Sequence, residues 1–361
     1  MDLVGLYLKY QRDWVARRAP APPMSIPKTL IGPRRLVACL GADPRLPPLV
    51  LPAMRLLRDR YENARLCVVT GADNTAALRR ERIADKALVL QEKKGSGRVS
   101  EIRRLGKEVA KLEPDILFVF DGESDPRLLA VAHESKTPLR VGFGVGEHHP
   151  FLNFEVAPPR ETTYLAQALL DLVGAVTGRF LDFLDDPVRG RVSEADAKRA
   201  ERLVHFWQPR SERLLVAVEP GTEEGKEPDL AKFVAVARLL SKAFGARVMI
   251  VAGPERRGAA EELERRLAFL EPYRAQTDDL PQAVAFVSRA DLMVSANTPL
   301  FHYAVTLGVP TLGLFSDDTP SWLIPSAGTA ARILPIRKEI TEDQFLKVVD
   351  ELGAEVTGGG S

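Results

Sequence analysis

The stretch ADLMVSANTPLFHYAVTLGVPTLGLF, residues 290–315, decides the fold class of this chain. It contains a short apolar run, DLMVSA (291–296), a polar turn, the helical pattern PLFHYAVTLG (299–308) and a second apolar run, PTLGLF (310–315). Continuous apolar runs of this length predict strands buried on both faces, and a helix between two of them predicts a parallel βαβ unit. The stretch therefore indicates an α/β fold.

The same alternation extends along most of the chain. In the first half, apolar runs at 36–40, 65–70, 86–91, 115–120 and 139–144 alternate with helical patterns at 51–61, 75–84, 99–112 and 126–135. In the second half, runs at 213–221, 246–253, 291–296 and 310–315 alternate with helical patterns at 229–244, 255–270, 280–290, 299–308 and 341–352. This rhythm predicts two doubly wound, Rossmann-like domains that face a central cleft, with ligands beyond the carboxyl ends of the strands.

The length of 361 residues is also typical of two domains. We expect a basic N-terminal arm at 1–33, domains at 34–178 and 213–354, a linker region at 179–212 and a flexible tail at 355–361. The linker region contains one helical pattern, at 194–207.

The composition excludes several classes of protein. With 50 basic and 49 acidic residues the net charge is +1, so the chain as a whole offers no electrostatic basis for a nucleic-acid partner. Cys39 and Cys67 lie in apolar runs and read as buried thiols, not as a disulfide framework or a zinc site. No stretch approaches the roughly 20 apolar residues of a membrane span, and no signal peptide is evident. We expect a cytoplasmic protein.

The N-terminal arm is the one clearly basic region, with seven basic and two acidic residues within 1–35. Residues 1–18 form an amphipathic helical pattern, and the Pro-rich segment 19–27 cannot continue it. The helix either packs on its own domain or touches an anionic membrane surface.

Polar loops follow the strands of the second half. Thr298 is placed to cap a helix and Pro299 to occupy its first turn, which creates an anion site or a plain helix cap. Lys226 could reach a diphosphate, although its acidic neighbours also suit a solvated surface lysine. Glu255 could accept hydrogen bonds from ribose hydroxyls or simply favour a helix N-terminus. His302 falls on the first turn of the helix, beside the anion site or as a structural histidine.

Two loops of the first half carry candidate residues. Asp121 and Glu123, in DGESD (121–125), could bind acceptor hydroxyls, whereas hard cations need more ligands than this motif offers. Asp43, in LGADPR, could act as a general base or as a turn-forming Asp-Pro. No metal site is expected, and no Walker or G-x-G-x-x-G motif occurs.

Several blocks together resemble the glycosyltransferase family 9 enzymes, which include the ADP-heptose:lipopolysaccharide heptosyltransferases. Residues 290–325 resemble a strand, an S-N-D-[ST]-G-x-x-H turn and a helix ending in L-G-x-P. VEPGTEEGKEPDLAKF, IVAGPERRGAAEEL and LPAMRLLRDRYENARLCVVT resemble further family blocks in the family's order, and the resemblance covers most of residues 34–350.

The resemblance implies a GT-B architecture and inverting transfer, without a metal or other cofactor, from a nucleotide-sugar such as ADP-heptose to a cell-envelope glycan or glycolipid. It implies that the C-terminal domain binds the donor through Lys226, Glu255, Asn297, Thr298, Pro299, Leu300 and His302. It places the acceptor on the N-terminal domain, where Asp121 and Glu123 are the candidates for binding its hydroxyls and Asp43 is the candidate base.

The chain departs from the family pattern at important positions. Asn297 replaces the Asp of the turn, Pro299 replaces its Gly, and Glu219 replaces the His of an H-P-G block. Leu46 stands where the spacing of the family's catalytic Asp falls, so Asp43 fills that role only if the loop is rebuilt. These departures keep open a degenerate member that serves as a binding or scaffold subunit. Another GT-B enzyme, such as a nucleotide-sugar epimerase, is a third possibility.

Overall fold

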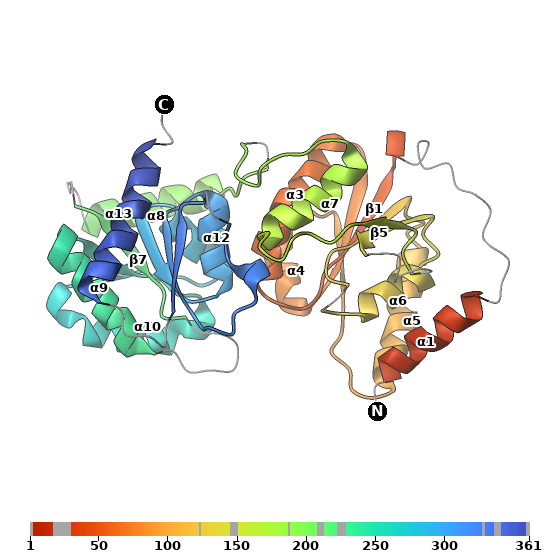
Figure 1. Ribbon diagram of the computed structural model, residues 1–361, viewed down its shortest axis with the longest axis horizontal. Helices are drawn as coiled ribbons and strands as arrows, with labels where there is room; N and C mark the ends of the chain where they lie inside the picture. Colours follow the sequence, from red (N-terminus) through yellow and green to blue (C-terminus); the bar gives the residue numbers. More distant parts are fainter. Residues whose placement is uncertain are drawn as a thin grey trace. The chain divides into compact units, whose positions relative to one another are not determined.

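The chain forms two compact units. The computed structural model describes residues 3–16, 30–122, 124–144, 151–186, 188–207, 213–221, 229–326, 329–335 and 341–358. Unit 1 comprises Met1–Arg160 and Ala166–Val188, and unit 2 comprises Glu161–Leu165 and Arg189–Ser361. Figure 1 shows that each unit is built from a sheet with helices packed against it.

Unit 1 is a six-stranded parallel sheet with the strand order β3-β2-β1-β4-β5-β6. Its strands are β1 (Arg35–Cys39), β2 (Arg65–Thr70), β3 (Lys86–Val89), β4 (Ile116–Val119), β5 (Leu139–Phe143) and β6 (Phe154–Val156). Its helices are α1 (Leu3–Ala16), α3 (Leu46–Arg60), α4 (Ala72–Arg80), α5 (Gly97–Ala110), α6 (Arg127–Glu134) and α7 (Leu165–Thr177). Because the order reverses between β1 and β4, the carboxyl ends of these two strands form the topological switch point, where α/β sheets bind ligands.

Unit 2 repeats this topology in the order β12-β11-β10-β7-β8-β9, again with parallel pairs only. Its strands are β7 (Leu215–Val218), β8 (Arg247–Ile250), β9 (Tyr273–Arg274), β10 (Leu292–Ser295), β11 (Thr311–Phe315) and β12 (Ala331–Pro335). Its helices are α8 (Glu194–Trp207), α9 (Leu230–Phe244), α10 (Arg257–Arg266), α11 (Leu280–Val287), α12 (Pro299–Leu307) and α13 (Glu342–Gly358), with short 3₁₀ turns η1 (Pro254–Arg256), η2 (Ala268–Leu270) and η3 (Ser321–Leu323). Here the switch point lies between β7 and β10.

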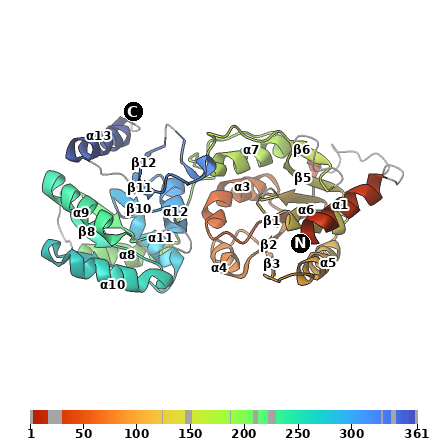
Figure 2. The ribbon, with the colours of Figure 1, turned by 60° about the horizontal axis from the view of Figure 1, so that its bottom comes forward.

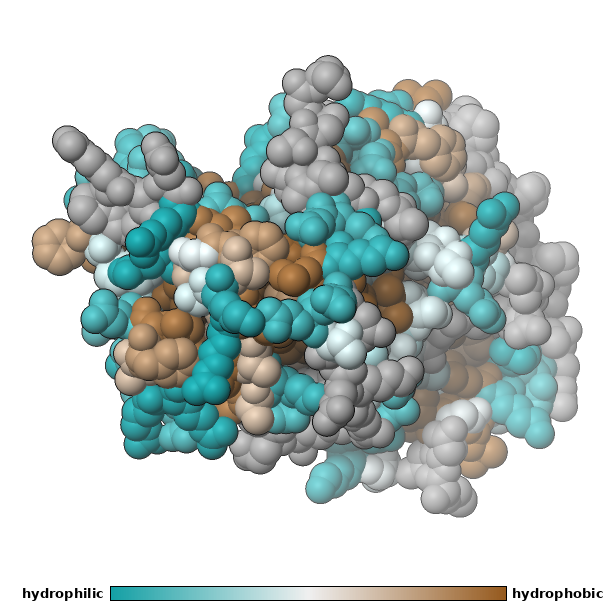
Figure 3. Space-filling model, turned by 60° about the vertical axis from the view of Figure 1, so that its left-hand side comes forward, coloured by the Kyte–Doolittle hydropathy of each residue, from teal (hydrophilic) through white to brown (hydrophobic). Residues whose placement is uncertain are grey.

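The apolar runs of the sequence form the cores of both sheets. Every residue of β4, β7, β10 and β11 is buried, as expected for strands that helices cover on both faces. Each unit has its own cluster of buried apolar side chains. Polar side chains are interspersed with small apolar patches on the face of the molecule seen in Figure 3.

Several elements differ from the sequence prediction. Helix α3 begins at Leu46, not at residue 51, because Pro47 and Pro48 fit the first turn, where no backbone N–H is needed. Strands β6, β9 and β12 were not predicted. Strands β6 and β9 have only three and two residues, and β12 contains Arg332 and Pro335 and is only partly buried, so none of them presents a clear apolar run. Helix α13 continues to Gly358, into the segment predicted to be a flexible tail.

The segment predicted as a linker, 179–212, is divided between the two units. Arg189 Nε donates to the Leu307 carbonyl at 2.8 Å and Gly190 N donates to the Thr306 carbonyl at 2.9 Å, so this part of the chain is bound to α12. Helix α8 packs against α11. The N-terminal arm likewise joins unit 1, where α1 packs against α5. None of the helices in the described ranges combines the length and apolar character that crossing a membrane requires.

Candidate functional site

The switch point of unit 2 collects four polar side chains. Glu219 directly follows β7, while Ser295, Asn297 and Thr298 lie at the end of β10 and in the turn before α12. Strands β7 and β10 are direct neighbours, so their carboxyl ends bring these residues together. All four side chains are buried, which makes their hydrogen-bond partners decisive.

Glu219 is the centre of this cluster. Its carboxylate Oε2 accepts hydrogen bonds from the hydroxyls of Ser295 and of Thr298, the latter at 2.5 Å. Burial raises the pKa of Glu219 to about 7, and the negative charge of Glu255 adds to this, whereas the two hydroxyls and Arg256 act in the opposite direction. An acidic side chain that can be neutral near physiological pH therefore lies beneath the start of α12.

Helix α12 begins as the sequence predicted. Thr298 is the N-cap, its Oγ1 accepts from the backbone N–H of Phe301 at 3.2 Å, and Pro299 is in the first turn. Because Thr298 also donates to Glu219, a carboxyl group of the chain itself already interacts with the positive end of the helix dipole. The side chain of Leu300 is buried in the core, so it can offer a ligand its backbone alone.

A chain of hydrogen bonds from Tyr164 through His302 positions the side chain of Asn297. The Tyr164 hydroxyl lies 2.8 Å from His302 Nδ1, and His302 Nε2 lies 2.9 Å from Asn297 Oδ1. Burial raises the pKa of Tyr164 well above its usual value, so the phenol keeps its proton and donates to Nδ1. Nε2–H then donates to Oδ1, and the Asn297 amide presents its Nδ2 group outward from this chain. That buried Nδ2 finds no partner among the described residues, so its hydrogen-bonding capacity is left unsatisfied.

The structure thus changes the interpretation of His302. Its side chain is fully buried, so it orients Asn297 within the protein. Tyr164, Ser295 and the protonatable Glu219 were not predicted as site residues. Tyr164 is 138 positions away from His302 and gives no local signal.

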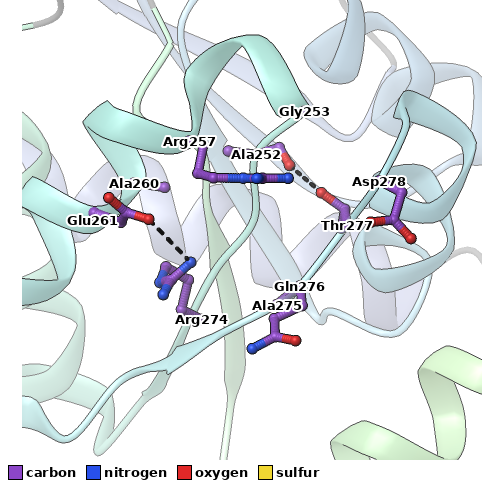
Figure 4. A pocket seen from close by; sticks show the side chains of 10 residues that line it. All are labelled: Ala252, Gly253, Arg257, Ala260, Glu261, Arg274, Ala275, Gln276, Thr277 and Asp278. Atoms are coloured by element: carbon purple, nitrogen blue, oxygen red, sulfur yellow. Dashed lines mark hydrogen bonds and ion pairs between the residues drawn. The ribbon is translucent and has the colours of Figure 1, made fainter.

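A hollow of about 360 Å³ lies at the carboxyl ends of β8 and β9, and β8 is the neighbour of β7 in the sheet (Figure 4). Its lining includes Gly253, Arg257, Arg274 and Thr277, and Thr277 donates from its hydroxyl to the Ala252 carbonyl. Arg274 and Glu261 both line the hollow and form an ion pair, with Nη1 of Arg274 3.8 Å from Oε1 of Glu261. The hollow offers both donors and acceptors to a polar ligand.

One predicted donor residue, Glu255, lies near this edge. Glu255 is exposed in η1, and its carboxylate folds back over Gly253, where a Cβ would come within 2.5 Å of Oε1. Glycine at this position therefore permits the approach. Lys226 lies outside the described residues.

The switch point of unit 1 also carries carboxylates. Asp43 follows β1, Asp121 follows β4, and both line a hollow of about 480 Å³. Gly41 permits this arrangement, because a Cβ there would lie 2.1 Å from Asp121 Oδ2. The structure therefore brings Asp43 and Asp121 together, while Glu123 lies outside the described residues.

Asp43 is not a free carboxylate. Arg45 binds it in a two-pronged ion pair, with Nε 2.9 Å from Oδ1 and Nη2 2.5 Å from Oδ2, and the Arg45 backbone N–H donates to Oδ1 at 2.8 Å. In this conformation both oxygens are engaged, so proton abstraction by Asp43 requires Arg45 to move. In the described parts of the chain, no three His, Cys, Asp or Glu side chains are grouped to hold a metal ion.

Comparison with known proteins identifies the family. The sequence profile of glycosyltransferase family 9 (heptosyltransferase) matches residues 102–344. The chain belongs to glycosyltransferase family 9. As a family 9 protein it is a glycosyltransferase, which confirms the predicted enzyme class. No curated protein matches the sequence significantly.

Solved structures confirm the predicted GT-B fold of this family 9 chain. A family 9 glycosyl transferase from Veillonella parvula is similar at 17% identity and a TM-score of 0.67, over 90% of this chain and 98% of the other. The E. coli ADP-heptose LPS heptosyltransferase II is similar at 19% identity and a TM-score of 0.62, over 90% and 99%. E. coli heptosyltransferase WaaC with ADP is similar at 12% identity and a TM-score of 0.62, over 88% and 99%.

Proposed function

We propose that this family 9 glycosyltransferase transfers a heptose-like sugar from a nucleotide-sugar, with inversion and without a metal, to a cell-envelope glycan or glycolipid. The observation that carries the donor half of this proposal is the buried, unpartnered Nδ2 of Asn297 at the start of α12. The names of the similar structures, which include heptosyltransferases and ADP, support the choice of sugar and nucleotide.

In this proposal unit 2 holds the donor. The turn formed by Asn297, Thr298, Pro299 and Leu300 receives the diphosphate, His302 orients Asn297, and Lys226 adds a positive charge. Glu255 accepts from the ribose. The hollow of about 360 Å³ beside Gly253 receives the remainder of the nucleoside. The positive end of the α12 dipole stabilises the leaving phosphate.

Unit 1 holds the acceptor, with Asp121 and Glu123 binding its hydroxyls. After release by Arg45, Asp43 removes the proton of the attacking hydroxyl. The new bond forms between the acceptor oxygen and the anomeric carbon, the bond from that carbon to the diphosphate breaks, and the nucleoside diphosphate leaves with the electron pair. Attack opposite to the leaving group inverts the anomeric centre.

A second candidate, a binding subunit that has lost transfer, is favoured by one observation. The carboxylate of Asp43, the proposed base, is engaged in an ion pair with Arg45. The variant Asp43→Asn separates sugar transfer from donor binding, because it removes the base and leaves the donor turn untouched.

The partners of this enzyme are a nucleotide-sugar and a glycan or glycolipid. Its place of action is the cytoplasm, at the inner face of the membrane, with the arm of residues 1–18 in contact with the lipid surface. No cofactor is needed besides these substrates.

Calorimetric titration with ADP, UDP, GDP and ADP-heptose tests the proposal. We expect binding of one nucleotide, tightened by its sugar, and a loss of that binding in the Asn297→Ala variant. Folded protein that binds none of the four ligands would reject the donor site and favour the binding subunit.

A further inference from the structure

A hollow of about 950 Å³ lies between α1 and α5 on unit 1. Figures 1 and 2 both show these two helices side by side, at one side of the sheet. The carboxylates of Asp43 and Asp121 line a different cavity, which α1 also borders through Val4, Gly5 and Leu8. The hollow between α1 and α5 contains none of the residues proposed for the chemistry.

Helix α1 is firmly attached to unit 1. Val4 and Tyr7 are buried and belong to the core of that unit. The Tyr7 hydroxyl donates to Glu134, at the end of α6, and the Arg103 guanidinium carbon lies 5.7 Å from the centre of the Tyr7 ring. The outer side of α1 consequently keeps a defined orientation relative to α5.

That outer side exposes two large apolar side chains in the same hollow. Leu6 is 57% exposed and Tyr10 is 64% exposed, and they are one helical turn apart. Val99 of α5 lines the same hollow. Neighbouring exposed apolar groups of this kind are typical of a surface that contacts a partner or a membrane.

Positive charge surrounds these apolar groups. Arg103 and Lys107, one turn apart on α5, line the hollow, and α1 adds exposed Lys9 and Arg12. The two helices together carry six cationic side chains and three carboxylates, and one of the carboxylates, Glu101, is buried. Lys107 forms no ion pair with the described residues.

We propose that this α1–α5 face, defined by Leu6, Tyr10, Arg103 and Lys107, docks on a membrane surface that contains anionic lipids. The cations meet the lipid phosphates, while Leu6 and Tyr10 enter the boundary between headgroups and acyl chains. The inference rests on the membrane contact proposed for residues 1–18 and extends it, because α5 supplies half of the site.

Vesicle sedimentation tests the proposal with the full chain. The vesicles consist of phosphatidylcholine alone or of phosphatidylcholine and phosphatidylglycerol at 7:3, in 100 mM salt. The variants are Leu6→Ser with Tyr10→Ser, and Lys107→Ser. The matched control is Phe206→Ser with Arg202→Ser on α8, where Phe206 is 88% exposed.

We expect the unmodified protein to sediment with the anionic vesicles and to stay in the supernatant with the neutral ones. The double variant should lower the partition coefficient at least tenfold, and Lys107→Ser should lower it about fivefold. The control should bind like the parent. All variants should keep the parent's circular dichroism spectrum and melting temperature, because the changed side chains are exposed.

Two results would overturn the proposal in different ways. If the parent binds neither vesicle, all membrane contact of the arm is rejected, and an acidic protein partner becomes the better explanation of the face. If the parent binds but the double variant binds equally well, contact through residues 1–18 survives and the α1–α5 face is rejected. ADP affinity, measured on the same samples, reports on the donor site independently of both results.

Discussion

Replacing Glu219 by glutamine should remove a pH-dependent cost of folding. The pKa of this carboxyl rises from 4.5 to about 7 on folding, mainly because the group is buried. Between pH 4.5 and about pH 7, Glu219 therefore keeps its proton in the native state and loses it in the unfolded state. The free energy of unfolding consequently falls as the pH rises through this range. A pKa difference of about 2.5 corresponds to a cost of about 3 kcal/mol, fully developed above pH 7 and absent below pH 4.5.

Glutamine cannot ionise, but its carbonyl oxygen can still accept from Ser295 and Thr298. Its amide adds a constant cost if it lacks a partner, so the informative quantity is the slope with pH. The difference in unfolding free energy, variant minus parent, should increase by about 3 kcal/mol between pH 4.5 and pH 8.

Urea unfolding at a series of pH values, without phosphate in the buffer, measures this difference. Circular dichroism and the fluorescence of Trp207 and Trp322, which belong to unit 2, follow the transition. Glu201→Gln, an exposed glutamate of α8, is the matched control and should show no such increase. Two results would refute the reasoning. One is an unfolding free energy that depends on pH in the same way for the parent and for Glu219→Gln. The other is a ¹³C-carboxyl titration of Glu219 with a midpoint near 4.5.

Three further changes test the proposed site. Asp43→Asn should abolish transfer and leave ADP affinity nearly unchanged, and an unaltered turnover would remove Asp43 from the mechanism. Lys226→Ala should weaken ADP binding by about 1.5–3 kcal/mol, the strength of a hydrogen bond to a charged group, and an equal affinity in calorimetry would place the diphosphate elsewhere. Gly41→Ala should displace Asp121, since its new Cβ would lie 2.1 Å from Oδ2. Steady-state kinetics should then show a raised KM for the acceptor with ADP affinity preserved, and an unchanged KM would exclude Asp121 from acceptor binding.

The role of Glu219 also connects folding with the proposed donor site. A charged carboxylate at the N-terminus of α12 competes with a diphosphate for the same helix dipole, whereas a neutral carboxyl does not. The family resemblance has His at this position, so the exchange replaces a side chain that is positive when protonated by one that is negative when deprotonated.

Local patterns predicted the elements that position the site. The run 291–296 and the pattern 299–308 anticipate β10 and α12 within one or two residues, and the cap at Thr298 with Pro299 in the first turn is confirmed. Local signals of this kind suffice because strand burial and helix capping depend on residues close in sequence.

The first loop was harder to predict. Reading Asp43 as a base required knowing which neighbour holds its carboxylate, and the two-pronged contact with Arg45 becomes visible only once the turn has folded. The start of α3 was misplaced for a related reason, since Pro47 and Pro48 resemble loop residues until the first helical turn accommodates them.

The sequence by itself determined the α/β class, the tandem repeat of the fold and the family, because hydrophobic periodicity and the order of motifs are properties of the chain. Only the tertiary structure decided which side chains meet at the switch points. Tyr164 reaches His302, and Glu219 reaches Ser295 and Thr298, across 76 or more positions of sequence. Their hydrogen bonds and the raised pKa of Glu219 arise from burial and from neighbours that parallel strand pairing brings together, and no local pattern encodes either.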